Sequence, residues 1–78
     1  MTKNYEYFRT SDLPLATILS FNFPIIDIDK NNPKKAIFCF EKNKTINDFV
    51  IKYWNGELRI EPQRFFNQLK TVKNRLYL

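Results

Sequence analysis

The residue types that common enzymes need are scarce in this chain. It contains no histidine, one cysteine and one glycine among 78 residues. The lack of histidine excludes Ser-His-Asp and Cys-His catalysis, imidazole acid–base pairs and histidine-containing zinc sites. One cysteine cannot form a four-cysteine zinc site or a CxxC redox pair, and one glycine cannot build a standard phosphate-binding loop. We therefore expect no enzyme, no cofactor and no small-molecule substrate.

One short segment has the spacing of a cation site. Asp27, Asp29 and Asn31 occupy the first, third and fifth positions of a calcium loop, whose twelfth position should be a bidentate glutamate. Here the twelfth position is Phe38, and the flanking residues are typical of strands rather than helices. The same two carboxylates could assist acid–base chemistry. A solvated strand face that runs into an Asn-rich turn is the preferred interpretation over calcium binding or acid–base chemistry.

Cys39 lies between two phenylalanines in an apolar strand pattern, Phe38-Cys39-Phe40. A free buried cysteine behaves as a small hydrophobic residue. A reactive thiol would need a nearby cation to lower its pKa. We therefore expect Cys39 to be part of the core.

The charge of the chain suits an anionic partner. Its 13 Lys and Arg outnumber its 8 Asp and Glu, giving a formal charge of +5. Most of these cations are lysines, which are poorly suited to bidentate recognition of bases or phosphates. From residue 62 to the end there is no acidic residue. The candidate partner-binding residues are Lys34, Lys35, Lys42, Lys44, Arg59, Arg64, Lys70, Lys73, Arg75 and Tyr77.

Three interpretations of the basic residues remain open. On a helical wheel, Arg64 and Arg75 flank one side of the apolar seam of the last helix, and Lys70 and Lys73 lie on the other side. Two flanks fit side chains that extend around a buried stripe. The alternatives are phosphate contacts to nucleic acid, weakly sequence-specific and strongly salt-dependent, or an acidic protein partner.

Large rings are more numerous than a thin core can hold. A chain of this length buries only about 60–65% of the surface that its unfolded form exposes. The rings competing for burial are Tyr5, Tyr7, Phe8, Phe21, Phe23, Trp54, Phe66 and Tyr77. Exposed rings beside cations suit a protein interface or base stacking. The leading hypothesis is a non-enzymatic module that binds a protein or a second copy through exposed aromatics and the last helix; the alternative is nucleic-acid binding.

The elements that position these residues follow from periodicity and capping signals. We predict one α+β domain over 1–78, in which a small antiparallel sheet packs against three helices at about 11–20, 45–55 and 62–76. The sheet contains a hairpin at about 25–41, whose second strand is central, and a short strand near 5–9. Residues 58–60 are long enough for a further short strand or for an extended link. Ser11 or Thr10 is expected to cap the first helix, and Thr45 the second.

The segment 45–56 has the clearest helical pattern in the chain. Ile46, Phe49, Val50, Tyr53 and Trp54 recur at helical spacing, which predicts one inward face. Trp54 is accordingly interpreted as a packing residue. Gly56 is expected to end this helix in the left-handed conformation. The last helix is expected to turn Phe65, Leu69, Val72 and Leu76 inward.

Targeting signals are missing from the sequence. No apolar run approaches ~18 residues, so we expect no membrane span. The first residues, Met1 to Glu6, lack the apolar core of a signal peptide, and a single cysteine suits a reducing compartment. These observations predict a cytoplasmic protein.

The order of the motifs resembles small bacterial and phage-associated domains of unknown function. The pattern reads as 8–13 (FRTSDL), 37–41 (IFCFE) and 53–56 (YWNG), followed by Pro62, Phe66, Leu69, Lys70 and Lys73. It covers almost the whole chain, from about Tyr7 to Tyr77. The resemblance implies the α+β architecture and the helix boundaries. It implies no activity, cofactor or catalytic residue.

Overall fold

The fold is known from a computed structural model that describes residues 6–77. A three-stranded antiparallel sheet packs against three helices, which confirms the predicted α+β class. The elements in chain order are β1 (Tyr7–Thr10), α1 (Leu13–Leu19), β2 (Asp27–Asp29), β3 (Ile37–Glu41), α2 (Lys44–Trp54) and α3 (Pro62–Leu76). Within residues 6–77, the segment 58–60 belongs to no strand, which favours the link over the short strand as its interpretation.

Strand β3 lies in the middle of the sheet, as predicted, with the order β1-β3-β2. Phe8 pairs with Phe40, and Ile28 pairs with Phe38. Because side chains alternate along a strand, Phe38 and Phe40 point to one face of the sheet, and Cys39 points to the other. Phe38 and Phe40 are fully buried against the helices, so this inner face of the sheet is one wall of the core.

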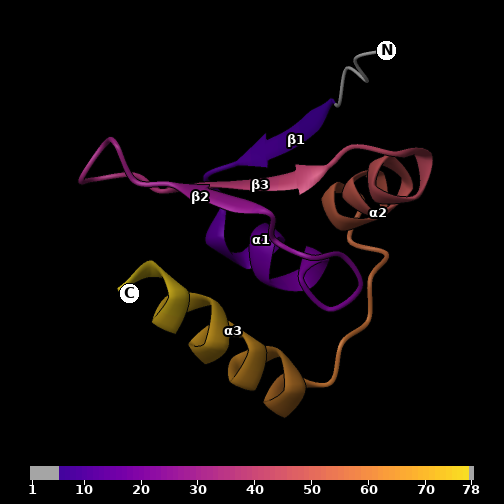
Figure 1. Cartoon of the computed structure of the whole chain (residues 1–78). Coiled ribbons are helices and arrows are strands. Elements are labelled where there is room, and N and C mark those ends of the chain that lie inside the picture. Colours follow the sequence, from indigo (N-terminus) through magenta and orange to yellow (C-terminus); the bar gives the residue numbers. More distant parts are fainter. Residues whose placement is uncertain (1–5, 78) are drawn as a thin grey trace.

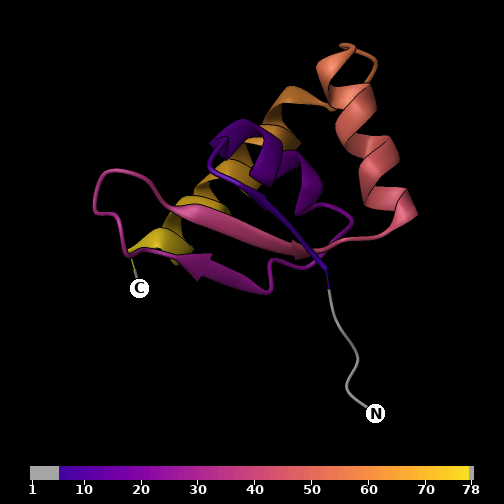
Figure 2. The same ribbon diagram turned by 90° about the horizontal axis from the view of Figure 1, so that it is seen from above.

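The helices share one side of the sheet. Helices α1 and α3 lie side by side below it, and α2 lies at the end where β3 terminates (Figures 1 and 2). Each helix contributes a fully buried aliphatic residue to the core, for example Leu19 from α1, Ile46 from α2 and Val72 from α3. Short helix α1 is the central piece, because both other helices pack against it.

The first hairpin strand is shorter than predicted. The Ile26 N–H donates to the Cys39 carbonyl at 2.9 Å, although Asp27 is the register partner of Cys39. Two successive residues of this segment therefore oppose Cys39, as in a β-bulge, and the alternation of side chains is broken. Ile25 is consequently buried and Ile26 is exposed, whereas strict alternation from Ile28 would turn Ile26 toward the inner face and Ile25 away from it.

Two helix caps differ from prediction. The cap of α1 is Asp12, whose carboxylate accepts the Leu15 N–H at 3.0 Å, rather than Ser11 or Thr10. The Thr10 hydroxyl instead accepts the Asp12 N–H.

The cap of α2 is Asn43, whose side-chain oxygen accepts the Ile46 N–H at 2.8 Å. Thr45 therefore lies inside the helix. An Asn directly before a helix is as good a cap as Thr, so the sequence did not decide between them.

The ends of α2 and α3 follow the sequence closely. Gly56 has φ +70°, its N–H donates to the Tyr53 carbonyl, and the Glu57 N–H donates to the Lys52 carbonyl. This pair of bonds is a Schellman motif and confirms Gly56 as the residue that ends the helix. Helix α3 begins at Pro62 as predicted, with Glu61 as its cap. The predicted seam of α3 is confirmed, since Val72 is buried and its other members are partly buried.

Candidate functional site

The outer side of helix α2 carries two large apolar residues that do not pack in the core. Trp54 is 65% exposed and Ile51 is 58% exposed. They are three residues apart in a helix, so their side chains are neighbours. We call Ile51, Trp54 and the exposed Asp48 the α2 face. The prediction that Trp54 packs inward was wrong: it lies at the edge of the predicted stripe, about 80° around the helix from Ile46.

Tyr53 is the neighbour that separates the α2 face from the core. Its ring is part-buried and meets the Trp54 ring edge to face, with centroids 4.9 Å apart. Burial raises the pKa of the Tyr53 hydroxyl, and so does the nearby Asp12 carboxylate. Because Asp12 caps α1 and Tyr53 packs against the core, Tyr53 places the last turn of α2 close to the start of α1. Trp54 is thereby held at a defined position on the surface.

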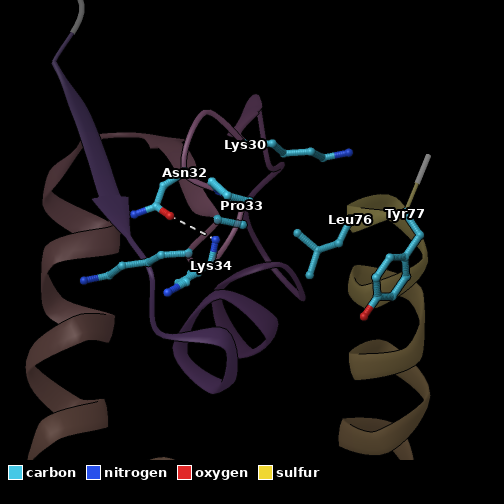
Figure 3. Close-up of a pocket in the computed structure, with 8 residues that line it drawn as sticks. Lys30, Asn32, Pro33, Lys34, Leu76 and Tyr77 are labelled. Atoms are coloured by element: carbon cyan, nitrogen blue, oxygen red, sulfur yellow. Dashed lines mark hydrogen bonds between the residues drawn. The ribbon is translucent and has the colours of Figure 1, made fainter.

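A second feature is a hollow at the opposite end of the molecule, which we call the basic hollow. It lies between the β2–β3 loop and the C-terminal end of α3, with a volume of about 320 Å³ (Figure 3). Its lining residues are Lys30, Asn32, Pro33, Lys34, Lys35, Ala36, Leu76 and Tyr77. Three of the predicted site residues, Lys34, Lys35 and Tyr77, are thus brought together, although more than 40 residues separate Lys34 from Tyr77 in sequence.

Hydrogen bonds within the loop and across to α3 set the shape of the basic hollow. The Asn32 side-chain oxygen accepts the Lys34 N–H at 2.9 Å, and the Asn32 carbonyl accepts the Lys35 N–H at 3.1 Å. The Lys30 ammonium donates to the Arg75 carbonyl at 3.3 Å, which joins the loop to the last turn of α3. Lys34 and Lys35 therefore extend from a hydrogen-bonded turn, and Lys30 extends from a loop that is hydrogen-bonded to α3.

The remaining predicted cations serve separate parts of the surface. Arg75 donates to the Ile25 carbonyl at 3.3 Å. The Lys42 ammonium lies 3.8 Å from the Glu6 carboxylate. Lys44 is exposed in the first turn of α2.

Lys70 and Lys73 are exposed on α3, on the side of the helix that leads to Tyr77. The ten candidate partner-binding residues predicted from the sequence therefore do not form one continuous surface.

Arg59 and Arg64 line a different hollow of about 270 Å³ near the start of α3. The Arg64 guanidinium lies over the Phe21 ring, 5.4 Å from its centroid. The backbone N–H groups of Arg64 and Gln63 donate to the Glu61 carboxylate and lower its pKa. This cluster connects the 57–61 link to α1 and serves packing.

The outer face of the sheet has a third hollow of about 310 Å³, lined by Tyr7, Arg9, Ile26, Asp27 and Cys39. Cys39 is buried beneath it, as expected for a packing residue, but on the side of the sheet opposite the core cluster.

The residues with the spacing of a calcium loop lie in β2 and in the turn after it. Asp27 and Asp29 belong to β2, and the Asp29 carboxylate accepts the Asn31 N–H at 2.9 Å. Among residues 6–77, no group of three or more Asp, Glu or Cys is placed to hold a metal ion. In the same part of the chain, no helix is both long and apolar enough to cross a membrane.

Sequence reasoning missed Ile51 and Lys30. Ile51 lies outside the apolar stripe of α2, and an isolated apolar residue on a helix exterior is a weak signal on its own. Lys30 begins the turn four residues before Lys34, and a single lysine in a turn is a weak signal of a site. Tyr5, one of the rings expected to compete for burial, lies outside the described residues. Of the other rings in that group, Tyr7, Trp54, Phe66 and Tyr77 are exposed.

Comparison with known proteins gives a family but no activity. No curated protein and no solved structure matches the chain. One family matches residues 5–78, and its description is domain of unknown function (DUF5659). This range covers all of the strands and helices described above, including both the α2 face and the basic hollow. The chain therefore belongs to the DUF5659 family of domains of unknown function.

Proposed function

We propose that this chain is a non-enzymatic protein-binding module that docks through the α2 face. The observation that carries the proposal is the exposure of Trp54 beside Ile51 on a helix whose opposite side is anchored in the core. Tryptophan is enriched among the residues that dominate binding energy at protein interfaces. Two adjacent large apolar residues on one helix face form a compact anchor for such a contact.

The partner that best fits the α2 face is a second copy of the chain. In a twofold contact, one patch meets itself, so the patch must be self-complementary. If two α2 helices cross antiparallel with Ile51 at the centre, Asp48 of each copy faces Trp54 of the other, since these residues lie on either side of Ile51 and three residues from it. The Asp48 carboxylate then accepts the indole N–H, which needs an acceptor when tryptophan is buried.

The charge of the α2 face also permits contact between two copies. Most of the surface of a +5 chain repels an identical surface, but α2 carries Asp48 with Lys44 four residues before it and Lys52 four residues after it. Its exposed side is therefore mixed in charge, with a net charge of only +1 from these three residues, unlike the basic hollow at the other end of the molecule. Two copies of α2 consequently repel each other less than two copies of α3, which carries four basic residues and no acidic one.

Sedimentation velocity over a range of protein concentrations tests this proposal. We expect the wild-type chain to form dimers reversibly, Trp54→Ala to stay monomeric, and Asp48→Ala to dimerise more weakly. Phe66→Ala is the matched control, because it removes another ring that is 58% exposed from a different helix, α3. A wild-type chain that stays monomeric at all concentrations would reject self-association through the α2 face. So would an equal loss of dimerisation in Phe66→Ala and Trp54→Ala.

A further inference from the structure

Helix α3 has an exposed stripe of rings and lysines that leads into the basic hollow. Phe66, Lys70, Lys73 and Tyr77 recur at spacings of four, three and four residues, so they follow one side of the helix. Phe66 is 58% exposed, Tyr77 is 83% exposed, and both lysines are exposed. At about 1.5 Å per residue, the two rings stand roughly 16 Å apart with the lysines between them. We call these four residues the α3 stripe.

The basic hollow adds three further lysines at the Tyr77 end of the stripe. Lys30, Lys34 and Lys35 line it from the β2–β3 loop, and Tyr77 lines it from α3 (Figure 3). No acidic residue occurs in 30–40 or in 62–78. The α3 stripe thus leads, through Tyr77, to a hollow that three lysines line.

Lysines and exposed rings together match the chemistry of unpaired nucleotides. Phosphates attract lysine ammonium groups, and bases stack on flat aromatic side chains without regard to sequence. A volume of about 320 Å³ beside the Tyr77 ring is ample for one base or one phosphate. A duplex would leave the rings without a stacking partner, because its bases are already paired and stacked. An acidic protein segment would satisfy the lysines but would make no use of rings placed at both ends of the stripe.

We propose that the basic hollow and the α3 stripe bind single-stranded nucleic acid, with lysines at the phosphates and a base stacked on Tyr77. Recognition is weakly dependent on sequence, because lysine acts as a point charge and does not read base edges in a fixed geometry. The basic hollow lies at the end of the molecule opposite α2, and α3 leads toward it in both views of the fold (Figures 1 and 2). It is therefore independent of the α2 face, and either proposal can fail without the other.

Fluorescence polarisation of a labelled oligothymidylate at increasing salt tests this inference. We expect the wild-type chain to bind at low salt, with log K falling linearly with log salt concentration. Lys34→Gln/Lys35→Gln should bind more weakly and lower the slope by about 1.4, from ~0.7 per phosphate contact on a single strand. Tyr77→Ala should bind about tenfold more weakly, and Tyr77→Phe should retain stacking and bind like the wild type.

The matched control is Lys44→Gln/Lys52→Gln, which removes the same charge from exposed positions on α2. It should leave the slope close to that of the wild type. The proposal is overturned if the wild type does not bind oligothymidylate at low salt, or if the two double variants lose affinity for it equally. It is also overturned if the duplex binds more tightly than the single strand, or if polyglutamate binds as tightly and with the same dependence on Tyr77.

Discussion

Ile46 and Ile51 lie on opposite sides of helix α2: Ile46 is fully buried in the core, whereas Ile51 is mostly exposed. The two isoleucines are separated by about 140° around the helix axis. One helix therefore carries both a core anchor and a surface patch. The side toward α1 holds the fold together, and the side with Ile51 and Trp54 is free to meet a partner.

Truncation of each isoleucine in turn should separate these two roles. We expect Ile46→Ala to lower the free energy of unfolding by about 2–5 kcal/mol, because it removes buried methyl groups and leaves a cavity. Ile51→Ala should change it by no more than about 0.5 kcal/mol. Urea unfolding followed by far-UV circular dichroism measures both values. A large loss of stability in Ile51→Ala would show that the α2 face is part of the core.

The cap of α2 can be tested with a neighbouring pair of residues. Asn43→Ala removes the side-chain oxygen that accepts the Ile46 N–H and should cost about 0.5–2 kcal/mol. Thr45→Ala should be neutral or slightly stabilising, since alanine is the better helix former inside a helix. Thermal or urea unfolding of the two variants shows whether Asn43 or Thr45 caps α2. If Thr45→Ala is the more destabilising change, the helix begins later than Lys44.

Gly56→Ala should be destabilising for a purely conformational reason. Gly56 has φ +70°, a region that alanine adopts only at a cost of about 1 kcal/mol. A Cβ at this position meets no atom within 4 Å, so no steric clash adds to that cost. Asn55→Ala is the control, because Asn55 already has a right-handed helical conformation. Equal unfolding free energies for the two variants would argue against the Schellman motif.

The cap of α3 should make stability depend on pH in the acid range. The backbone N–H groups of Arg64 and Gln63 hold the pKa of Glu61 below its ordinary value of 4.5. The ionised form is thus favoured in the folded chain. The contribution of ionised Glu61 to folding stability is therefore fully present above pH 4.5. It is lost as the pH falls through the lower pKa that Glu61 has in the folded chain.

Urea unfolding at a series of pH values measures this contribution. We expect Glu61→Gln to lose stability relative to the wild type at neutral pH and to differ less from it at low pH. Glu57→Gln removes an exposed carboxylate from the same link without removing a cap. The free energy of unfolding of Glu57→Gln should vary with pH as that of the wild type does. If Glu61→Gln also showed the wild-type pH dependence, the Glu61 carboxylate would not be a stabilising cap of α3.

The sequence predicted the architecture because its strongest signals are local. The central position of β3 followed from apolar residues on both of its faces, and α3 followed from Pro62 and a seam of apolar residues at spacings of four, three and four. The caps of α1 and α2 were misassigned because Ser, Thr, Asp and Asn are all favoured as caps and several of them are neighbours before each helix. Only backbone geometry decides which of them accepts the hydrogen bond.

The candidate surfaces were less predictable because they depend on tertiary packing. Trp54 belongs to the apolar stripe of α2 by spacing, but it is the member of that stripe farthest around the helix from the buried Ile46, and it is exposed. The approach of Lys34 and Lys35 to Tyr77 depends on how α3 crosses beneath the sheet. No local pattern encodes that crossing, so sequence reasoning identified these residues singly but could not place them together.

The fluorescence of Trp54 tests the central claim most directly, since Trp54 is the only tryptophan in the chain. The emission maximum and iodide quenching are measured while the protein is diluted. Dimerisation through the α2 face predicts a blue-shifted, protected indole at high concentration that becomes red-shifted and quenchable on dilution, and Asp48→Ala should make this transition at higher concentration. An indole that is equally quenchable at every concentration at which sedimentation detects dimers would contradict the account.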